Sequence, residues 1–289
     1  MDIIKVKNLK KHFGKTKAVD GISFDVKRGE IFGFLGPNGA GKTTTIRCMM
    51  DFLRPNSGNI SISGLDAHKD SVVLKQKIGY LSGDKNFYNW KTKEHINFFA
   101  ALRGDKDSKK LIKELDLDLE KRAGQLSSGN KQKLGLVLAL MSKPEVMIMD
   151  EPTVGLDPIL QNTVYKILHK LSASGTTIFM SSHNLPEVER VCSKVAIIKN
   201  GKIVGIEDIV NLESKRIHTI NVYFDEDYDR NDLKMEGVEI MQHMDHEGVV
   251  LKVKGDINPV LKKLTEYKLR DIEIGHATLE EVFLEFYKK

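Results

Sequence analysis

The stretch that decides the fold is GPNGAGKTT, residues 36–44. It follows a short apolar run, Ile31 to Leu35, which predicts a buried strand, and it precedes a segment from Thr45 onward that predicts a helix. A strand, a glycine-rich loop, Lys-Thr and a helix in this order identify a phosphate-binding loop. The nine residues of this candidate nucleotide-binding loop are Gly36, Pro37, Asn38, Gly39, Ala40, Gly41, Lys42, Thr43 and Thr44.

The residue types of this loop suit phosphate binding for physical reasons. Its glycines let the backbone curl so that successive N–H groups point into one concavity, and the helix that starts near Lys42 adds its positive end. Lys42 can reach the terminal phosphates, and the Thr43 hydroxyl can bind Mg²⁺. A glycine-rich turn that happens to precede a lysine is the weaker alternative, because every position is filled and both flanks are right. The loop indicates a nucleoside triphosphate but leaves open a GTPase, a kinase and a transport ATPase.

A pair of acidic residues follows another apolar strand. Val146 to Met149 is fully apolar and leads directly into Asp150 and Glu151. We expect Asp150 to hold Mg²⁺, directly or through water, and Glu151 to act as the general base for a water that attacks the γ-phosphate. Two surface carboxylates at a strand end are the alternative, which the phosphate loop upstream disfavours.

The composition excludes several classes of protein. The chain has 289 residues, 40% of them hydrophobic and 29% charged, which allows one large domain or two with a full core. Cys48 and Cys192 lie far apart and in no CxxC pattern, so we expect reduced core thiols of a cytosolic protein. The N-terminus shows no signal-peptide pattern. The longest apolar run, Leu134 to Met141, is far shorter than the roughly 20 residues of a membrane span. A role at a membrane therefore requires a partner, and the net charge of +5, with both signs interleaved, disfavours a nucleic-acid face.

The run from Leu126 to Pro158, LSSGNKQKLGLVLALMSKPEVMIMDEPTVGLDP, resembles the signature-to-D-loop block of ABC transporter ATPases. Five motifs in the right order make the resemblance specific over residues 1 to about 210. By this resemblance the catalytic residues are Glu151, His183 and Lys42. The positions that match the family's motifs are the signature residues Ser127, Ser128, Gly129 and Asn130, the Walker B pair Asp150 and Glu151, the D-loop Asp157, the switch histidine His183 and the adenine-stacking Phe13.

The resemblance implies a function and partners. It implies two such cassettes that sandwich two ATP molecules with Mg²⁺, the signature of each protomer completing the site of the other. It implies a transmembrane permease as partner, at the cytoplasmic face of the cell membrane. The tail, ending ATLEEVFLEFYKK, is similar to the C-terminal domain of subunits that serve sodium, daunorubicin and bacitracin exporters, so we expect an exporter of a drug, peptide or ion. The alternative is a soluble ABC ATPase that acts on nucleic acid or the ribosome. It is disfavoured because the chain shows one cassette and neither coiled coils nor zinc modules.

The expected fold class is α/β. It comprises a P-loop NTPase core with an antiparallel β subdomain and an α-helical subdomain, plus a small C-terminal α+β domain. The expected boundaries are 1–212 for the nucleotide-binding domain, with the helical subdomain at about 84–140, and 216–289 for an accessory or regulatory domain. Among the local elements, Leu74 to Leu81 is expected to contain a strand, and 259–268 and 279–287 are expected to be helices.

Two positions depart from the family's pattern. In the signature, Ser128 stands where glycine is usual and Asn130 where Gln or Met is usual. In the Q-loop the family has Gln or Glu, but this chain has Gly83, which has no side chain to offer a metal, followed by Asp84. Asp84 is therefore a candidate Mg²⁺ ligand, since carboxylate oxygens suit that cation. The alternative is that Asp84 is a solvated charge and that a water takes the place of the missing ligand.

Overall fold

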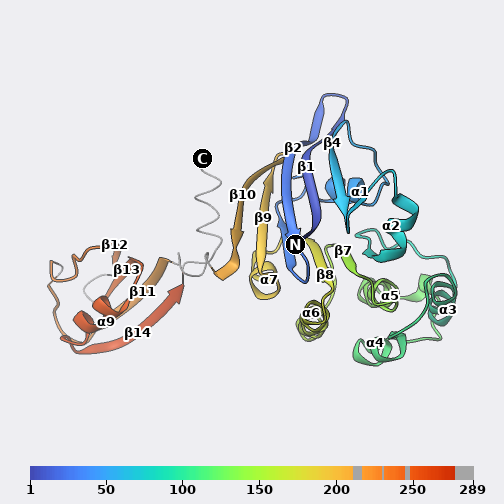
Figure 1. The fold of residues 1–289 in the computed structure, drawn as a ribbon. Helices are drawn as coiled ribbons and strands as arrows, with labels where there is room; N and C mark the ends of the chain where they lie inside the picture. Colours follow the sequence, from blue (N-terminus) through green and yellow to red (C-terminus); the bar gives the residue numbers. More distant parts are fainter. Residues whose placement is uncertain (211–216, 230, 245–247, 277–289) are drawn as a thin grey trace. The chain divides into compact units, whose positions relative to one another are not determined.

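The computed structural model describes residues 1–289 except 211–216, 230, 245–247 and 277–289. The chain forms two compact units, Met1–Glu207 and Asp208–Lys289 (Figure 1). Within the described residues, none of the helices combines the length and the apolar character that crossing a bilayer would require.

A six-stranded sheet forms the centre of the first unit. Its order is β10-β9-β3-β8-β7-β6, and β3 pairs in parallel with both β8 and β9. Parallel pairing aligns the carboxyl ends of neighbouring strands at one edge, which is where loops bind ligands in such sheets. The strands are β3 (Ile31–Leu35), β6 (Ile78–Leu81), β7 (Val146–Asp150), β8 (Thr177–Ser182), β9 (Lys194–Lys199) and β10 (Lys202–Asp208).

A second sheet of four strands, in the order β2-β1-β4-β5, is antiparallel. Four phenylalanine rings join the two sheets: Phe24 of the second sheet lies 5.5 to 5.6 Å from the rings of Phe32, Phe34 and Phe179 of the first. These rings are buried, so the two sheets share one core. The strands are β1 (Asp2–Phe13), β2 (Thr16–Lys27), β4 (Ser57–Ile62) and β5 (Leu65–Asp66).

The helices of this unit place the loops of interest. Helix α1 packs between the sheets, against β2 and β7, while α3 and α4 both pack on α5 to form the helical region seen beside the sheet (Figure 1). The helices are α1 (Lys42–Met49), α2 (Ser71–Lys77), α3 (Thr92–Arg103), α4 (Ser108–Glu114), the 3₁₀ turn η1 (Ala123–Gln125), α5 (Ser128–Leu140), α6 (Pro158–Ala173) and α7 (Leu185–Val191).

The second unit is a small α+β domain. Its antiparallel sheet, in the order β12-β13-β11-β14, has helix α9 against one face. Alternate positions of β11, including Ile220 and Val222, are fully buried with Val260 and Leu264 of the helix. The elements are β11 (Ile217–Phe224), β12 (Val238–Met244), β13 (Gly248–Lys254), α9 (Asn258–Leu264) and β14 (Leu269–His276).

The structure confirms the expected fold class and shortens one expected helix. The strand expected within Leu74 to Leu81 is present as β6 from Ile78, and helix α2, which buries Leu74, precedes it. The helix expected at 259–268 ends at Leu264, because the Lys268 N–H donates to the Glu226 carboxylate at 2.6 Å and the chain turns into β14. The helix expected at 279–287 lies outside the described residues.

Candidate active site

The loop between β3 and α1 has the geometry of a phosphate cradle. Gly41 has φ 111°, and a Cβ there would lie 2.3 Å from the Ala18 carbonyl oxygen, so only glycine fits. Lys42 begins α1 and is 6% exposed. Its Nζ folds over the loop and donates to the carbonyl oxygens of Gly36 at 2.6 Å and Pro37 at 3.2 Å. The ammonium is thus held at the mouth of the loop, where it can exchange backbone oxygens for phosphate oxygens.

A hydroxyl and a carboxylate meet beside this loop. The Thr43 Oγ1 donates to Asp150 Oδ2 at 2.7 Å, and the Ser181 hydroxyl donates to Asp150 Oδ1. Asp150 ends strand β7 and is 3% exposed. A hydroxyl and an ionised carboxylate are the hard oxygen donors that Mg²⁺ prefers, so this pair fits the metal. Among the described residues no three His, Cys, Asp or Glu side chains converge as a metal site.

The next residue, Glu151, lies between two potential cations. Its Oε2 is 2.8 Å from His183 Nδ1, and its Oε1 is 3.5 Å from Lys42 Nζ. Its backbone has φ 53°, a left-handed conformation that is uncommon for a residue with a side chain. The Glu151 N–H donates to the hydroxyl of Ser181 at 3.1 Å. This backbone aims the carboxylate at the space above the phosphate loop.

One cavity of about 290 Å³ is lined by Thr43, Asp150, Glu151 and His183 together. It brings together a lysine-bearing loop, an acidic strand end and a histidine from three separate stretches of sequence, an arrangement suited to attack by water on a bound phosphate. The residues that line it are Asn38, Thr43, Arg47, Ser82, Gly83, Asp84, Lys85, Asp150, Glu151, Val154 and His183.

The chain matches the family model described as ABC transporter over residues 19–154. It is 34% identical to an uncharacterized ABC transporter ATP-binding protein of Methanocaldococcus jannaschii over 93% of this chain and 97% of that protein. It is 32% identical to the bacitracin transport ATP-binding protein BcrA of Bacillus licheniformis over 99% of this chain and 95% of that protein.

The chain belongs to the ABC transporter ATP-binding proteins. It is the ATP-binding, ATP-hydrolysing subunit of such a transporter. A solved ATP-binding subunit of an ABC transporter matches 73% of this chain and 92% of that chain, with a TM-score of 0.68 and 28% identity. The structure of cbiO1 from Clostridium perfringens, part of an ABC transporter complex, matches 74% and 91% with a TM-score of 0.64 and 26% identity.

The signature segment of this ABC protein lies at the start of α5, apart from the residues that line the cavity. Ser127 is the N-cap, and its hydroxyl accepts from the Asn130 N–H at 3.3 Å. A Cβ at Gly129 would lie 2.9 Å from the Gly155 carbonyl oxygen, so the signature is packed tightly against the start of the D-loop. Asp157 of the D-loop caps α6 by accepting from the Leu160 N–H at 2.9 Å.

The two remaining candidate residues are exposed. Phe13 ends β1, is 49% exposed, and has the Lys11 ammonium 5.1 Å from its ring centroid. Asp84 lines the cavity, but its side chain is 69% exposed and accepts from Arg47 at 3.0 Å. Asp84 would therefore have to exchange Arg47 for a metal in order to act as a ligand.

Gly83 lies close to the Walker B carboxylate of Asp150. A Cβ built on it would be 3.2 Å from Asp150 Oδ2, a close contact that a small movement of the carboxylate relieves. A side chain at position 83 would therefore point directly at the Thr43–Asp150 pair. The glycine leaves this approach open to water or to Asp84.

Two buried polar residues of the site were not singled out from the sequence. Gln132 of α5 donates to the carbonyl oxygens of Glu151 and Pro152. Glu187 of α7 is 4% exposed, and burial raises the pKa of its carboxyl. Both lie inside the runs that carried the resemblance, LSSGNKQK and SSHNLPEVERVC, but no spacing rule marks them because their partners are distant in sequence.

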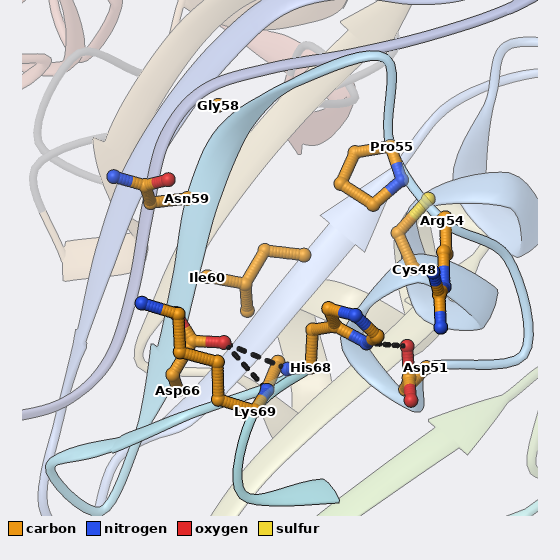
Figure 2. Close-up of a pocket in the computed structure, with 11 residues that line it drawn as sticks. Cys48, Asp51, Arg54, Pro55, Gly58, Asn59, Ile60, Asp66, His68 and Lys69 are labelled. Carbon is orange, nitrogen blue, oxygen red and sulfur yellow. Dashed lines mark hydrogen bonds and ion pairs between the residues drawn. The ribbon is translucent and has the colours of Figure 1, made fainter.

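A second cavity, of about 330 Å³, lies at the opposite end of α1 (Figure 2). There the Asp51 carboxylate is 2.9 Å from His68 Nδ1, and Asp66 accepts from the backbone of His68 and Lys69. The buried Cys48 thiol also lines this cavity, and burial raises its pKa to about 11, which leaves it protonated and unreactive at neutral pH. The cavity contains none of the phosphate-loop residues 36–44.

Proposed function

We propose that this chain powers an ABC exporter, and that Thr43, Asp150, Glu151, His183 and Lys42 perform ATP hydrolysis in the 290 Å³ cavity. The observation that carries the proposal is the position of Glu151, held between Lys42 and His183 directly beside the Thr43–Asp150 pair. A base, a cation and a metal-type donor pair in one cavity are the parts that in-line attack by water requires.

Each side chain has a distinct role in this proposal. Lys42 leaves the carbonyl oxygens of Gly36 and Pro37 for the β- and γ-phosphates and offsets the charge that develops there. Glu151 accepts the proton of the attacking water. His183, through its Nδ1, fixes the direction of the Glu151 carboxylate and offers its other ring nitrogen to the γ-phosphate. The N–H groups of residues 36–44 bind the remaining phosphate oxygens, and Phe13 stacks on adenine.

Mg²⁺ is the proposed cofactor. Thr43 and Asp150 would hold it, and Asp84 is a third candidate ligand once it leaves Arg47. When bound, the ion would supply positive charge that offsets the negative charge of the phosphates. The pairing of Thr43 and Asp150 at 2.7 Å supports this, because it already places two oxygen donors side by side.

The working form is a dimer of cassettes, with this chain paired to a second ABC subunit. Ser127, Ser128, Gly129 and Asn130 lie at the N-terminus of α5, where a helix offers N–H groups and positive potential to a phosphate. They do not line their own chain's cavity, which supports a role at the site of the partner subunit. ATP binding closes this dimer, and hydrolysis loosens it.

A permease in the cell membrane is the proposed partner, with this chain at its cytoplasmic face. A groove of about 170 Å³ between the sheet and the helical region supports this, since it joins the Q-loop to apolar side chains. Its lining is Tyr80, Leu81, Ser82, Asp84, Lys85, Asn86, Phe87, Phe99, Arg103, Gly135 and Leu138. A permease helix seated here would sense Ser82 and Asp84 at the edge of the active site.

An exported drug or peptide is the favoured cargo, chosen by the permease. The names of two relatives support this: the bacitracin transport protein BcrA, and the linearmycin resistance ATP-binding protein LnrL of Bacillus subtilis, 37% identical over 74% of this chain and 71% of that protein. We propose a cassette at 1–212 and an accessory regulatory domain at 216–289, which agrees in outline with the two compact units.

Glu151→Gln tests the hydrolytic site. It keeps the shape of the side chain and removes the base, so ATPase turnover should fall by ~10² to 10⁴-fold while ATP still binds and the closed dimer accumulates. The matched control is Glu145→Gln. Glu145 directly precedes the same strand, and its carboxylate pairs with Arg28 at 2.6 Å, so this change should keep turnover within about twofold. Near-normal turnover in Glu151→Gln would remove Glu151 from the base role.

Purification from native membranes tests the transport assignment. A tagged chain should bring down a protein with several membrane spans, and ATPase activity of that complex should respond to the exported compound. Recovery of ribosomes or nucleic acid instead of a membrane protein would contradict the transporter proposal.

A further inference from the structure

Gln132 connects the signature helix to the catalytic glutamate. It lies on α5, one turn after the capping residue Ser127, and is fully buried. Its Nε2 donates to the carbonyl oxygen of Glu151 at 3.3 Å and to that of Pro152. Its Oε1 is buried and has no hydrogen-bond partner among the described residues, so the amide is oriented by these two carbonyl groups alone.

These bonds reach the backbone at the point where it is most constrained. Glu151 has φ 53°, which costs of order 1 to 3 kcal/mol for a residue with a side chain and persists only where the surroundings enforce it. The Glu151 carbonyl oxygen also accepts from the Val154 N–H, at a long 3.4 Å, so Gln132 adds a second donor there and is the donor to the Pro152 carbonyl oxygen. Removing this donor would let the peptide relax and swing the carboxylate.

A second contact joins the same two segments. A Cβ at Gly129 would lie 2.9 Å from the carbonyl oxygen of Gly155, and a Cβ at Gly155 would lie 3.4 Å from Ser128 Oγ. The start of α5 therefore meets the segment 151–155 at two points: Gln132 bonds to residues 151 and 152, and residues 128–129 pack against Gly155. A displacement of the signature must be transmitted to the residues that follow β7.

We propose that Gln132 is a positioning residue that couples the signature helix to the Glu151 base of the same chain. This rests on the proposed dimer, in which the signature contacts the nucleotide of the other protomer. When residues 127–130 bind the nucleotide of the other protomer, α5 carries Gln132 with it. Gln132 then fixes the Glu151–Pro152 peptide, which directs the Glu151 carboxylate at the nucleotide of its own chain. The two sites of the dimer are linked in this way by one side chain in each protomer.

The test is Gln132→Leu, which keeps the size of the side chain and removes the amide donor. The matched control is Gln161→Leu. Gln161 lies on α6 and also donates through its Nε2 to a carbonyl oxygen of the same loop, that of Leu156 at 3.1 Å, five residues after Glu151. Turnover, the ATP concentration for half-maximal rate, the Hill coefficient and equilibrium ATP binding are measured for both variants.

Gln132→Leu should lower turnover about tenfold and bring the Hill coefficient for ATP toward 1, with ATP affinity unchanged. Combined with Glu151→Gln, it should still form the ATP-trapped dimer. Gln161→Leu should keep the wild-type Hill coefficient. Wild-type turnover and cooperativity in Gln132→Leu would overturn the proposal. Loss of ATP binding and of the trapped dimer would overturn it too, because Gln132 would then be a folding residue. Absence of ATPase activity in the wild-type chain would instead refute the proposed hydrolytic site.

Discussion

Replacing Glu187 tests how the two catalytic loops are held together. The Glu187 carboxylate accepts from the hydroxyls of Thr153 and Ser182, each at 2.5 Å. Thr153 lies two residues after Glu151, and Ser182 directly precedes His183. One buried side chain thus ties the segment that carries the base to the segment that carries the histidine.

Glu187→Ala should strongly destabilise the first unit. It removes the closest acceptor of both the Thr153 and the Ser182 hydroxyl, and it opens a small cavity. The Ser182 hydroxyl keeps the Asn184 carbonyl oxygen at 3.3 Å as an acceptor, so one buried hydrogen bond, at Thr153, carries most of the expected loss of about 1 to 3 kcal/mol. That is a substantial part of the ~5 to 15 kcal/mol that typically separates a folded domain from its unfolded state. Glu187→Gln keeps the shape and one acceptor oxygen, so its loss should be smaller.

The same site predicts a pH dependence. Burial raises the pKa of the Glu187 carboxyl above its ordinary value of 4.5, and the nearby Glu151 adds to the rise, while the hydroxyls of Ser182 and Thr153 oppose it. The folded state therefore keeps this proton where the unfolded state has released it. The stability from this group is complete below pH 4.5 and declines as the pH rises from there through the raised pKa. Glu187→Gln has no such proton, so its stability relative to wild type should increase across that window, by at most about 1.4 kcal/mol per pH unit.

Urea unfolding followed by fluorescence provides the assay. The chain has one tryptophan, Trp90, and it lies in the unit Met1–Glu207, so its signal reports that unit. Unfolding free energies of wild type, Glu187→Ala and Glu187→Gln are compared from pH 4.5 to 8. The reasoning fails if Glu187→Ala lies within about 0.5 kcal/mol of wild type, the range of an ordinary surface change, or if the Gln-to-wild-type difference is independent of pH.

Two further predictions concern the metal and the tail. Asp84→Ala should raise the Mg²⁺ concentration needed for half-maximal ATPase activity and lower the maximal rate, with ATP affinity little changed. Adding Gln at position 83 should partly restore the Mg²⁺ dependence and the rate, because its side chain would start 3.2 Å from Asp150 Oδ2. The matched control Arg47→Gln frees the Asp84 carboxylate without removing it and should not raise the Mg²⁺ requirement. An unchanged Mg²⁺ dependence in Asp84→Ala would show that Asp84 is not a ligand. A chain that ends at Leu212 should fold and bind ATP with Mg²⁺ in calorimetry, because the phosphate loop and both acidic residues lie in the first unit. A folded but non-binding product would contradict the proposed boundary.

The sequence by itself determined the local parts of this protein. Residues 36–44 specify a phosphate loop because the glycines, Lys42 and the flanking apolar and helical patterns are consecutive and act through nearby backbone. The apolar run before Asp150 likewise predicts strand β7. Such signals depend on neighbours within one turn or one strand, which is why they can be read from a single chain.

Only the tertiary structure decided which of these parts meet. Thr43 and Asp150 are 107 residues apart, and they touch because α1 packs against β7. Glu151 reaches His183 because β7 and β8 are parallel neighbours whose carboxyl ends lie together. The pairing of Asp84 with Arg47 and the bonds of Gln132 and Glu187 follow from the same packing. Contacts of this range depend on strand order and register, which are set by the burial of whole faces of the sheet and leave no local pattern in the sequence.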